Sequence, residues 1–178
     1  MQARGPLMIE HRLIERLIGR IGKEIRQISA KKQTDPILID TIVDFIKIYA
    51  DRTHHGKEED IYFKRLLEKS LAEADRRVMN ELIEEHKFGR KITAQLIEAN
   101  ARYRDGDLNA LTEIEAKLHT LAEFYPQHIE KEDKVFFPAA HQYFTDAEQQ
   151  EMLDAFWEFD RKMIHEKYEA VAKDMESR

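Results

Sequence analysis

The sequence predicts an all-α fold, a four-helix bundle with an additional C-terminal helix. Only six glycines and four prolines interrupt the 178 residues, so long helical segments can run between them. Apolar residues recur at intervals of three or four, the spacing of one helical face. The first such series is Leu13, Leu17, Ile21, Ile25 and Ile28. Little indicates a β-strand, and short loops should place consecutive helices antiparallel around a shared axis.

The first two helices are bounded by recognisable capping residues. The first is expected over about residues 7–30, followed by a loop at 31–34. Asp35 is a favourable N-cap residue, and Pro36 occupies the first helical position, where its missing N–H costs nothing. The second helix is then expected to continue to about Leu67.

The third helix has a start signal and a stop signal. Ser70 and Glu73 form a capping-box pattern, in which each side chain bonds the other residue's backbone N–H. The helix is expected to stop near Asp105 and Gly106, because glycine readily takes the left-handed conformation that ends helices. We therefore predict a third helix of about 35 residues.

Asp107 is expected to cap the fourth helix, and Thr145 with Glu148 repeats the capping box before a fifth. The fifth helix should cover a seam of the bundle or a partner, using Phe156, Trp157, Phe159 and Met163 for packing. We predict a single domain over residues 1–178, with the bundle at about 7–143 and the C-terminal helix at about 146–176.

Composition narrows the functional classes. The chain has 42% apolar and 36% charged residues, and no apolar run long enough for a membrane span. No secretory signal is evident, so a cytoplasmic location is expected. The net charge of −6 and the dispersed basic residues argue against a nucleic-acid partner. The absence of cysteine excludes disulfides, thiolate zinc sites and cysteine-bound iron–sulfur clusters, so any metal must be held by nitrogen and oxygen.

One unit of metal-competent residues occurs twice. His11 is followed 43 residues later by His54 and then Glu58, and His86 is followed 42 residues later by His128 and then Glu132. The segments around the second histidines also align without gaps, from His54 to Phe63 and from His128 to Phe137. A lone His and Glu at helical spacing is usually a surface pair, but recurrence of the whole unit favours a metal site.

The helical spacing of these residues predicts a binuclear metal site. A His and a Glu four positions apart lie on one face, so each pair can point inward together. Six ligands exceed the three or four of a typical zinc site. Two six-coordinate ions can share bridging carboxylates and leave a position open for a small molecule. The pattern favours two iron ions, with manganese or zinc as alternatives.

On these residues the sequence resembles the hemerythrin-like, or HHE cation-binding, family, with Glu10-His11 and Glu85-His86 as the leading pairs. The resemblance implies an up-down-up-down bundle that holds a non-haem di-iron centre with an oxo or hydroxo bridge. It also implies that Glu58 and Glu132 are the bridging carboxylates. Carried over by position, the implied ligands are His11, His54, Glu58, His86, His128 and Glu132.

The chain departs from the family's oxygen carriers at Arg90, where those proteins have a second histidine one turn after the first. Arginine stays protonated and cannot bind a cation, which weighs against reversible oxygen carriage. His55 could supply the missing nitrogen, as the residue after the motif histidine does in some relatives. It points about 100° away from His54 in an α-helix, so the alternative is a surface or supporting histidine. Gly56 suggests local distortion or close packing there.

Several residues have less certain roles. Asp51 and Tyr125 each precede a motif histidine by three positions and could hydrogen-bond a ligand or a bound oxygen species; otherwise Tyr125 is ordinary core. Pro126 marks either a small kink or an imperfect helix. Glu59 is expected to be a solvated charge. The remaining histidines are expected to be ordinary surface or core residues; they are His119, His141 and His165.

The sequence leaves three functions open. The first is a protein that binds or senses O2 or nitric oxide at an open iron position and reports it to a protein partner, or to a second copy, through the C-terminal helix. The second is iron storage, donation or repair under oxidative or nitrosative stress. The third is a di-iron peroxidase or oxidase, for which no acid–base pair can be identified. A metal-free helical bundle would require both repeats to be coincidental.

Overall fold

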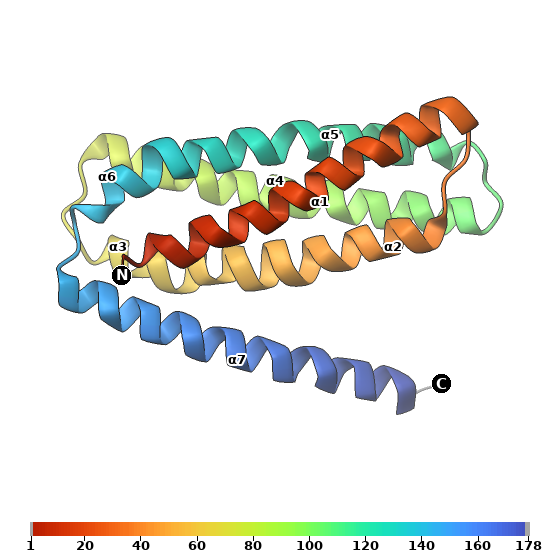
Figure 1. Ribbon diagram of the computed structural model, residues 1–178. Coiled ribbons are helices and arrows are strands. Elements are labelled where there is room, and N and C mark those ends of the chain that lie inside the picture. The colour runs from red at the N-terminus through yellow and green to blue at the C-terminus, as the bar shows by residue number, and fades with distance from the viewer. Residues whose placement is uncertain (1, 177–178) are drawn as a thin grey trace.

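The computed structural model describes residues 2–176 as four long helical segments that run alternately up and down, with a fifth helix along the outside (Figure 1). The first and third segments are uninterrupted, and the second and fourth each contain π-helical turns. In chain order the elements are α1 (Arg4–Lys31), α2 (Pro36–Phe45), η1 (Ile46–His55), η2 (Glu58–Phe63), α3 (Lys64–Leu67), α4 (Glu73–Arg104), α5 (Ala110–Lys131), η3 (Glu132–Phe136), α6 (Phe137–His141) and α7 (Asp146–Glu176).

Most of the predicted helix ends are confirmed. The Asp35 side chain accepts a hydrogen bond from the Ile37 backbone N–H at 2.9 Å, and Pro36 starts α2. Gly106 has a φ of 98°, the left-handed conformation expected after α4. Asp107, by contrast, is not the N-cap of the fourth segment as predicted: the N-cap of α5 is Asn109, and the Asp107 side chain accepts from the Asn109 backbone N–H at 3.1 Å in the turn before it.

The capping box predicted at Ser70 is wrong. The N-cap of α4 is Ala72, and no side chain caps this end. The Ala72 backbone N–H instead donates to the Tyr143 hydroxyl at 3.1 Å, and that hydroxyl donates to Asp75. A hydrogen bond to a residue 71 positions away therefore holds the start of α4, in place of the predicted Ser70 cap.

Helix α7 begins with the predicted capping box and packs with one face only. Thr145 and Glu148 exchange the expected bonds, with Thr145 N–H to Glu148 at 2.9 Å and Glu148 N–H to Thr145 at 3.3 Å. Phe156 is buried, but Trp157, which was expected to pack, is 72% exposed. Consecutive residues point about 100° apart, so the two cannot share a face. No helix within residues 2–176 is long and apolar enough to cross a membrane.

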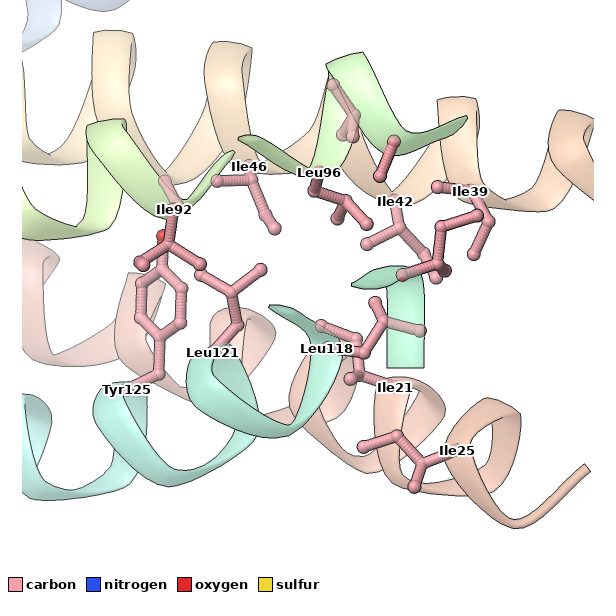
Figure 2. Packing of buried hydrophobic residues seen from close by; sticks show 14 of the residues in the cluster. Ile21, Ile25, Ile39, Ile42, Ile46, Ile92, Leu96, Leu118, Leu121 and Tyr125 are labelled. Atoms are coloured by element: carbon pink, nitrogen blue, oxygen red, sulfur yellow. The ribbon is translucent and has the colours of Figure 1, made fainter. Parts of the chain in front are cut away.

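The bundle interior consists of two apolar clusters. The larger cluster fills the half that contains the two loops at 32–35 and 105–109, with Ile21, Ile42, Leu96 and Leu118 fully buried (Figure 2). The smaller cluster fills the opposite half and is rich in aromatic rings; its members include Tyr62, Phe63, Phe136 and Phe137. Each large apolar side chain buried here contributes about 1.5–3 kcal/mol to folding.

A polar layer separates the two clusters. Along α1, His11 lies between Leu7 of the smaller cluster and Ile14 of the larger one. Along α4, His86 lies in the same way between Leu82 and Ile92. The apolar packing on both sides fixes the backbones that carry these histidines, so the layer is a rigid place for a polar site.

Candidate metal centre

The seven side chains predicted as ligands converge in this polar layer. Each is between 0% and 2% exposed. They form two groups, within each of which one potential ligand atom per residue lies within 4.8 Å of the others. The His54 group consists of His11, His54, Glu58 and Glu132, and the His55 group consists of His55, His86 and His128.

The Glu58 carboxylate spans the two groups. Its Oε1 lies 3.4 Å from His54 Nε2, and its Oε2 lies 3.4 Å from His86 Nε2. One oxygen therefore faces each group. This is the disposition that a carboxylate needs in order to bridge two cations.

Glu132 spans the groups from the opposite half of the repeat. Its Oε2 lies 3.1 Å from His11 Nε2, whereas its Oε1 lies 3.4 Å from His128 Nε2. Both carboxylates are completely buried. The two motif glutamates therefore occupy equivalent positions between the groups.

His55 points inward together with His54. The η1 segment is π-helical, and its wider turns reduce the angle between consecutive side chains below that of an α-helix. The Gly56 N–H bonds the carbonyl of Asp51, five residues earlier, as a π-turn requires. The His55 ring is 2% exposed and stacks on His86 with 3.9 Å between ring centroids.

The chemistry of the donor set fits metal ions. Seven buried polar atoms of the layer have no hydrogen-bond partner within the described part of the chain: Nε2 of His55, His86 and His128, and both carboxylate oxygens of Glu58 and Glu132. Burying such groups unpaired is costly, by about 1–3 kcal/mol each even for neutral ones. Cations bound between the two groups would satisfy these atoms.

Every histidine of the layer is oriented by a carboxylate on its other ring nitrogen. A hydrogen bond from Nδ1 to a carboxylate leaves the Nε2 lone pair available for a metal and makes the imidazole more basic. The five pairs are His11 with Asp133 (2.8 Å), His54 with Glu10 (2.9 Å), His55 with Asp51 (3.4 Å), His86 with Glu59 (2.7 Å) and His128 with Glu85 (2.8 Å).

These orienting carboxylates include the residues that the sequence interpretation missed. Glu59 was expected to be a solvated charge, and this is wrong, because it accepts from His86 and is only 27% exposed. Asp133 occupies the aligned position of the second repeat and accepts from His11. Each repeat therefore orients the leading histidine of the other. The acidic residue at this aligned position of both repeats was visible in the sequence, but the alignment does not show which helix each acidic residue faces.

Arg90 holds two of these carboxylates in place. Its Nε donates to Asp51 and its Nη2 donates to Glu59, both at 2.7 Å. Asp51 in turn accepts from His55, and Glu59 from His86. The residue that replaces a histidine of the oxygen carriers therefore supports two histidines of the His55 group instead of binding a cation itself.

A cavity of about 340 Å³ lies against the His55 group. Its polar lining includes His55, Asp51, Arg90 and Tyr125, and apolar residues such as Ile46 form most of the remainder. Tyr125 is 1% exposed and lies alongside Ile92 (Figure 2). Its hydroxyl makes no hydrogen bond to any residue in the range 2–176, and burial raises its pKa. Tyr125 therefore borders the cavity and does not bond a predicted ligand.

Individual histidines of the layer differ in their pKa. Burial opposes the charged form of His11, but the nearby carboxylates of Asp133 and Glu132 outweigh it and raise the His11 pKa to about 10. Burial lowers the pKa of His55, and neighbouring His86 lowers it further. Burial also opposes the charged form of His86, but the nearby carboxylates of Glu132, Glu58 and Glu59 outweigh it and raise the His86 pKa. A cation in either group must therefore displace a proton, from His11 in one and from His86 in the other, whereas the His55 ring is already neutral.

The three remaining histidines lie away from the two groups. His119 and His165 are exposed, and His141 contacts Gln149 and Gln2 away from the polar layer. All three lie outside the two groups, as expected. Pro126 lies inside α5, which continues past it to Lys131.

A family model, the hemerythrin HHE cation binding domain, matches residues 6–140. The chain belongs to this family. The match lies within the four bundle segments and ends before α7, so the fold is the predicted all-α hemerythrin-like bundle with an additional C-terminal helix. Membership and the two His/Glu groups together identify a metal-binding protein. No curated protein and no solved structure matched in the corresponding searches.

Proposed function

We propose that this hemerythrin-like protein holds two iron ions and binds O2 or nitric oxide at an open position of one of them. The observation that carries the proposal is the pair of buried glutamates, each with one oxygen toward the His54 group and the other toward the His55 group. One cation in each group would use both glutamates as shared ligands.

The donor set favours iron. His11, His54 and the two glutamates give the first group two nitrogens and two oxygens. The second group has three nitrogens, and the other oxygen of each glutamate faces it. Mixed imidazole and carboxylate sets with open positions are typical of non-haem iron, whereas structural zinc prefers four ligands and a closed site. Bound iron would supply the redox chemistry for diatomic ligands; manganese and zinc are the alternatives.

The cavity gives a small ligand a place beside the His55 group. It lies between η1 and α4, and its largely apolar lining is compatible with a diatomic molecule. The Tyr125 hydroxyl makes no hydrogen bond within residues 2–176, so it can donate one to such a molecule. With its raised pKa, Tyr125 keeps this proton at neutral pH.

Burial of the site favours ligand binding over iron donation. A donor protein must release its metal, but all seven side chains are at most 2% exposed and five carboxylates lock the histidines in place. Such preorganisation favours retention of the metal. An oxidase or peroxidase function has no comparable support, because the carboxylates around the site are already engaged with histidines or Arg90.

Metal content tests the proposal directly. Protein purified natively, or loaded anaerobically with ferrous iron, is expected to contain about two irons per chain, because the two groups have one cation position each. Elemental analysis should count iron, manganese and zinc together. The reduced protein should then be titrated with O2 and with nitric oxide while its optical absorption spectrum is recorded. A single zinc, or no metal after ferrous loading, would contradict the binuclear assignment.

A His55→Ala variant tests whether His55 is a seventh metal ligand or only a supporting residue. If His55 binds the metal of the second group, the optical spectrum of the iron-loaded protein should change and the affinity for that iron should fall, by about 10-fold or more. The matched control is His119→Ala, an exposed histidine on α5, which should leave both unchanged. An unaltered spectrum and iron content in His55→Ala would assign His55 to packing alone.

A further inference from the structure

Helix α7 packs directly on the segment that carries three of the predicted ligands. It lies along η1 and η2 on the outside of the bundle (Figure 1). Gly56 is at the closest approach, where an added Cβ atom would lie 2.8 Å from Cζ of Phe159. Any larger residue at this position must displace the Phe159 ring. The glycine that follows His55 therefore allows close contact between α7 and the ligand segment.

Lys57, the next residue, is completely buried. Its ammonium group donates to Glu10 of α1 and pairs with Asp160 of α7, with 2.8 Å from Nζ to Oδ1. It also lies 5.9 Å from the ring centroid of Phe156. A buried ammonium ion is costly unless it is paired, so α7 supplies one of the two anions that hold it.

Glu10 connects this lysine to the metal layer. One carboxylate oxygen accepts from Lys57, and the other accepts from Nδ1 of His54 at 2.9 Å. Three side chains therefore connect α7 to a predicted ligand: Asp160, Lys57 and Glu10. The position of α7 influences how firmly Glu10 holds the His54 ring.

The second repeat contains the same arrangement without α7. Lys131 aligns with Lys57 and donates to Glu85, which accepts from Nδ1 of His128 at 2.8 Å. Lys131, however, is 30% exposed, and its other anion is the half-exposed Glu81, at 3.6 Å. In this arrangement the halves differ in the burial of the lysine, since α7 covers Lys57 completely and Lys131 is 30% exposed.

We propose that α7 acts as a positioning element of the metal centre, holding His54 through Asp160, Lys57 and Glu10, so that docking of α7 and binding of metal stabilise each other. This rests on the proposed function, because it requires a metal at the His54 group. Coupling between two events is reciprocal, so the effect of α7 on metal retention must equal the effect of metal on α7 docking.

The test uses the full-length protein and the variant Asp160→Asn, with Glu81→Gln as the matched control in the second repeat. Asp160 is 41% exposed, so its neutral isostere should fold, which circular dichroism would verify. Two quantities are measured for each protein: equilibrium transfer of iron to a competing chelator, and hydrogen exchange of the α7 amides with and without iron. Neither variant changes a predicted ligand.

Iron loading of the wild type is expected to slow exchange along α7, and Asp160→Asn should weaken iron retention about fivefold, the low end of coupling between sites. Glu81→Gln should change neither quantity. Equal effects of the two variants, or α7 exchange that is the same with and without iron, would overturn the inference while leaving the proposed function intact. A wild type that binds no iron would overturn both.

Discussion

A Glu132→Ala variant is expected to lose most of its metal. The side chain is completely buried, and its two oxygens face His11 of one group and His128 of the other. Removing it takes a ligand from both cation positions at once. The affinity should therefore fall by more than the roughly 10- to 100-fold typical of losing a residue that only supports a ligand. Elemental analysis and chelator competition would measure the loss.

The matched control for this variant is Glu130→Ala. Glu130 lies two residues earlier on the same segment, but it is exposed and pairs with Lys134 on the surface. The Glu130→Ala variant should bind as much metal as the wild type does. Retention of two metal ions by Glu132→Ala would show that this carboxylate is not a shared ligand, and the assignment of both glutamates as bridges would then be wrong.

Removal of metal is expected to lower the thermal stability substantially. Without cations, both oxygens of Glu58 and of Glu132 lack hydrogen-bond partners in the interior described by residues 2–176. A ligand that binds only the folded state stabilises it by about 2.7 kcal/mol at 100 times its Kd. For a chain of this size, each kcal/mol shifts Tm by about 2–4 °C, so a rise of roughly 5–10 °C is expected on loading.

Calorimetry or circular dichroism on matched metal-free and iron-loaded samples would measure this shift. The Glu132→Ala variant provides the control, because its Tm should respond little to iron even though its fold is retained. Equal Tm values for the metal-free and loaded wild type would indicate that the buried glutamates and histidines satisfy one another without a cation, contrary to the proposed site.

Four of the converging side chains could be predicted because their pattern is local. A His and a Glu four residues apart must share a helical face, whatever surrounds the helix. Recurrence of the same unit then indicates that two helices present equivalent faces to one interior. The helix ends at Asp35, Gly106 and Thr145 were predictable for the same reason, since capping depends on residues that are near in sequence.

The supporting residues could not be assigned in this way, because they act across the bundle. Asp133 bonds His11 over 122 positions, and Glu59 bonds His86 over 27. Ser70 does not cap α4 as predicted, and the backbone N–H of Ala72 at this helix start donates to the distant Tyr143 hydroxyl. The sequence records which acidic residues exist, but only the meeting of particular helix faces decides which of them reach a histidine.

The sequence by itself determined the helices, the repeat and six of the seven converging side chains. The His and Glu pairs follow from spacing within one helix, and His11 and His86 follow from the recurrence of the whole unit. Tertiary structure alone decided the direction of His55 and the burial of Lys57. His55 turns inward because η1 is wound as a π-helix, and Lys57 is buried because α7 folds back over it. Both depend on packing between segments, which the order of residues along one helix does not specify.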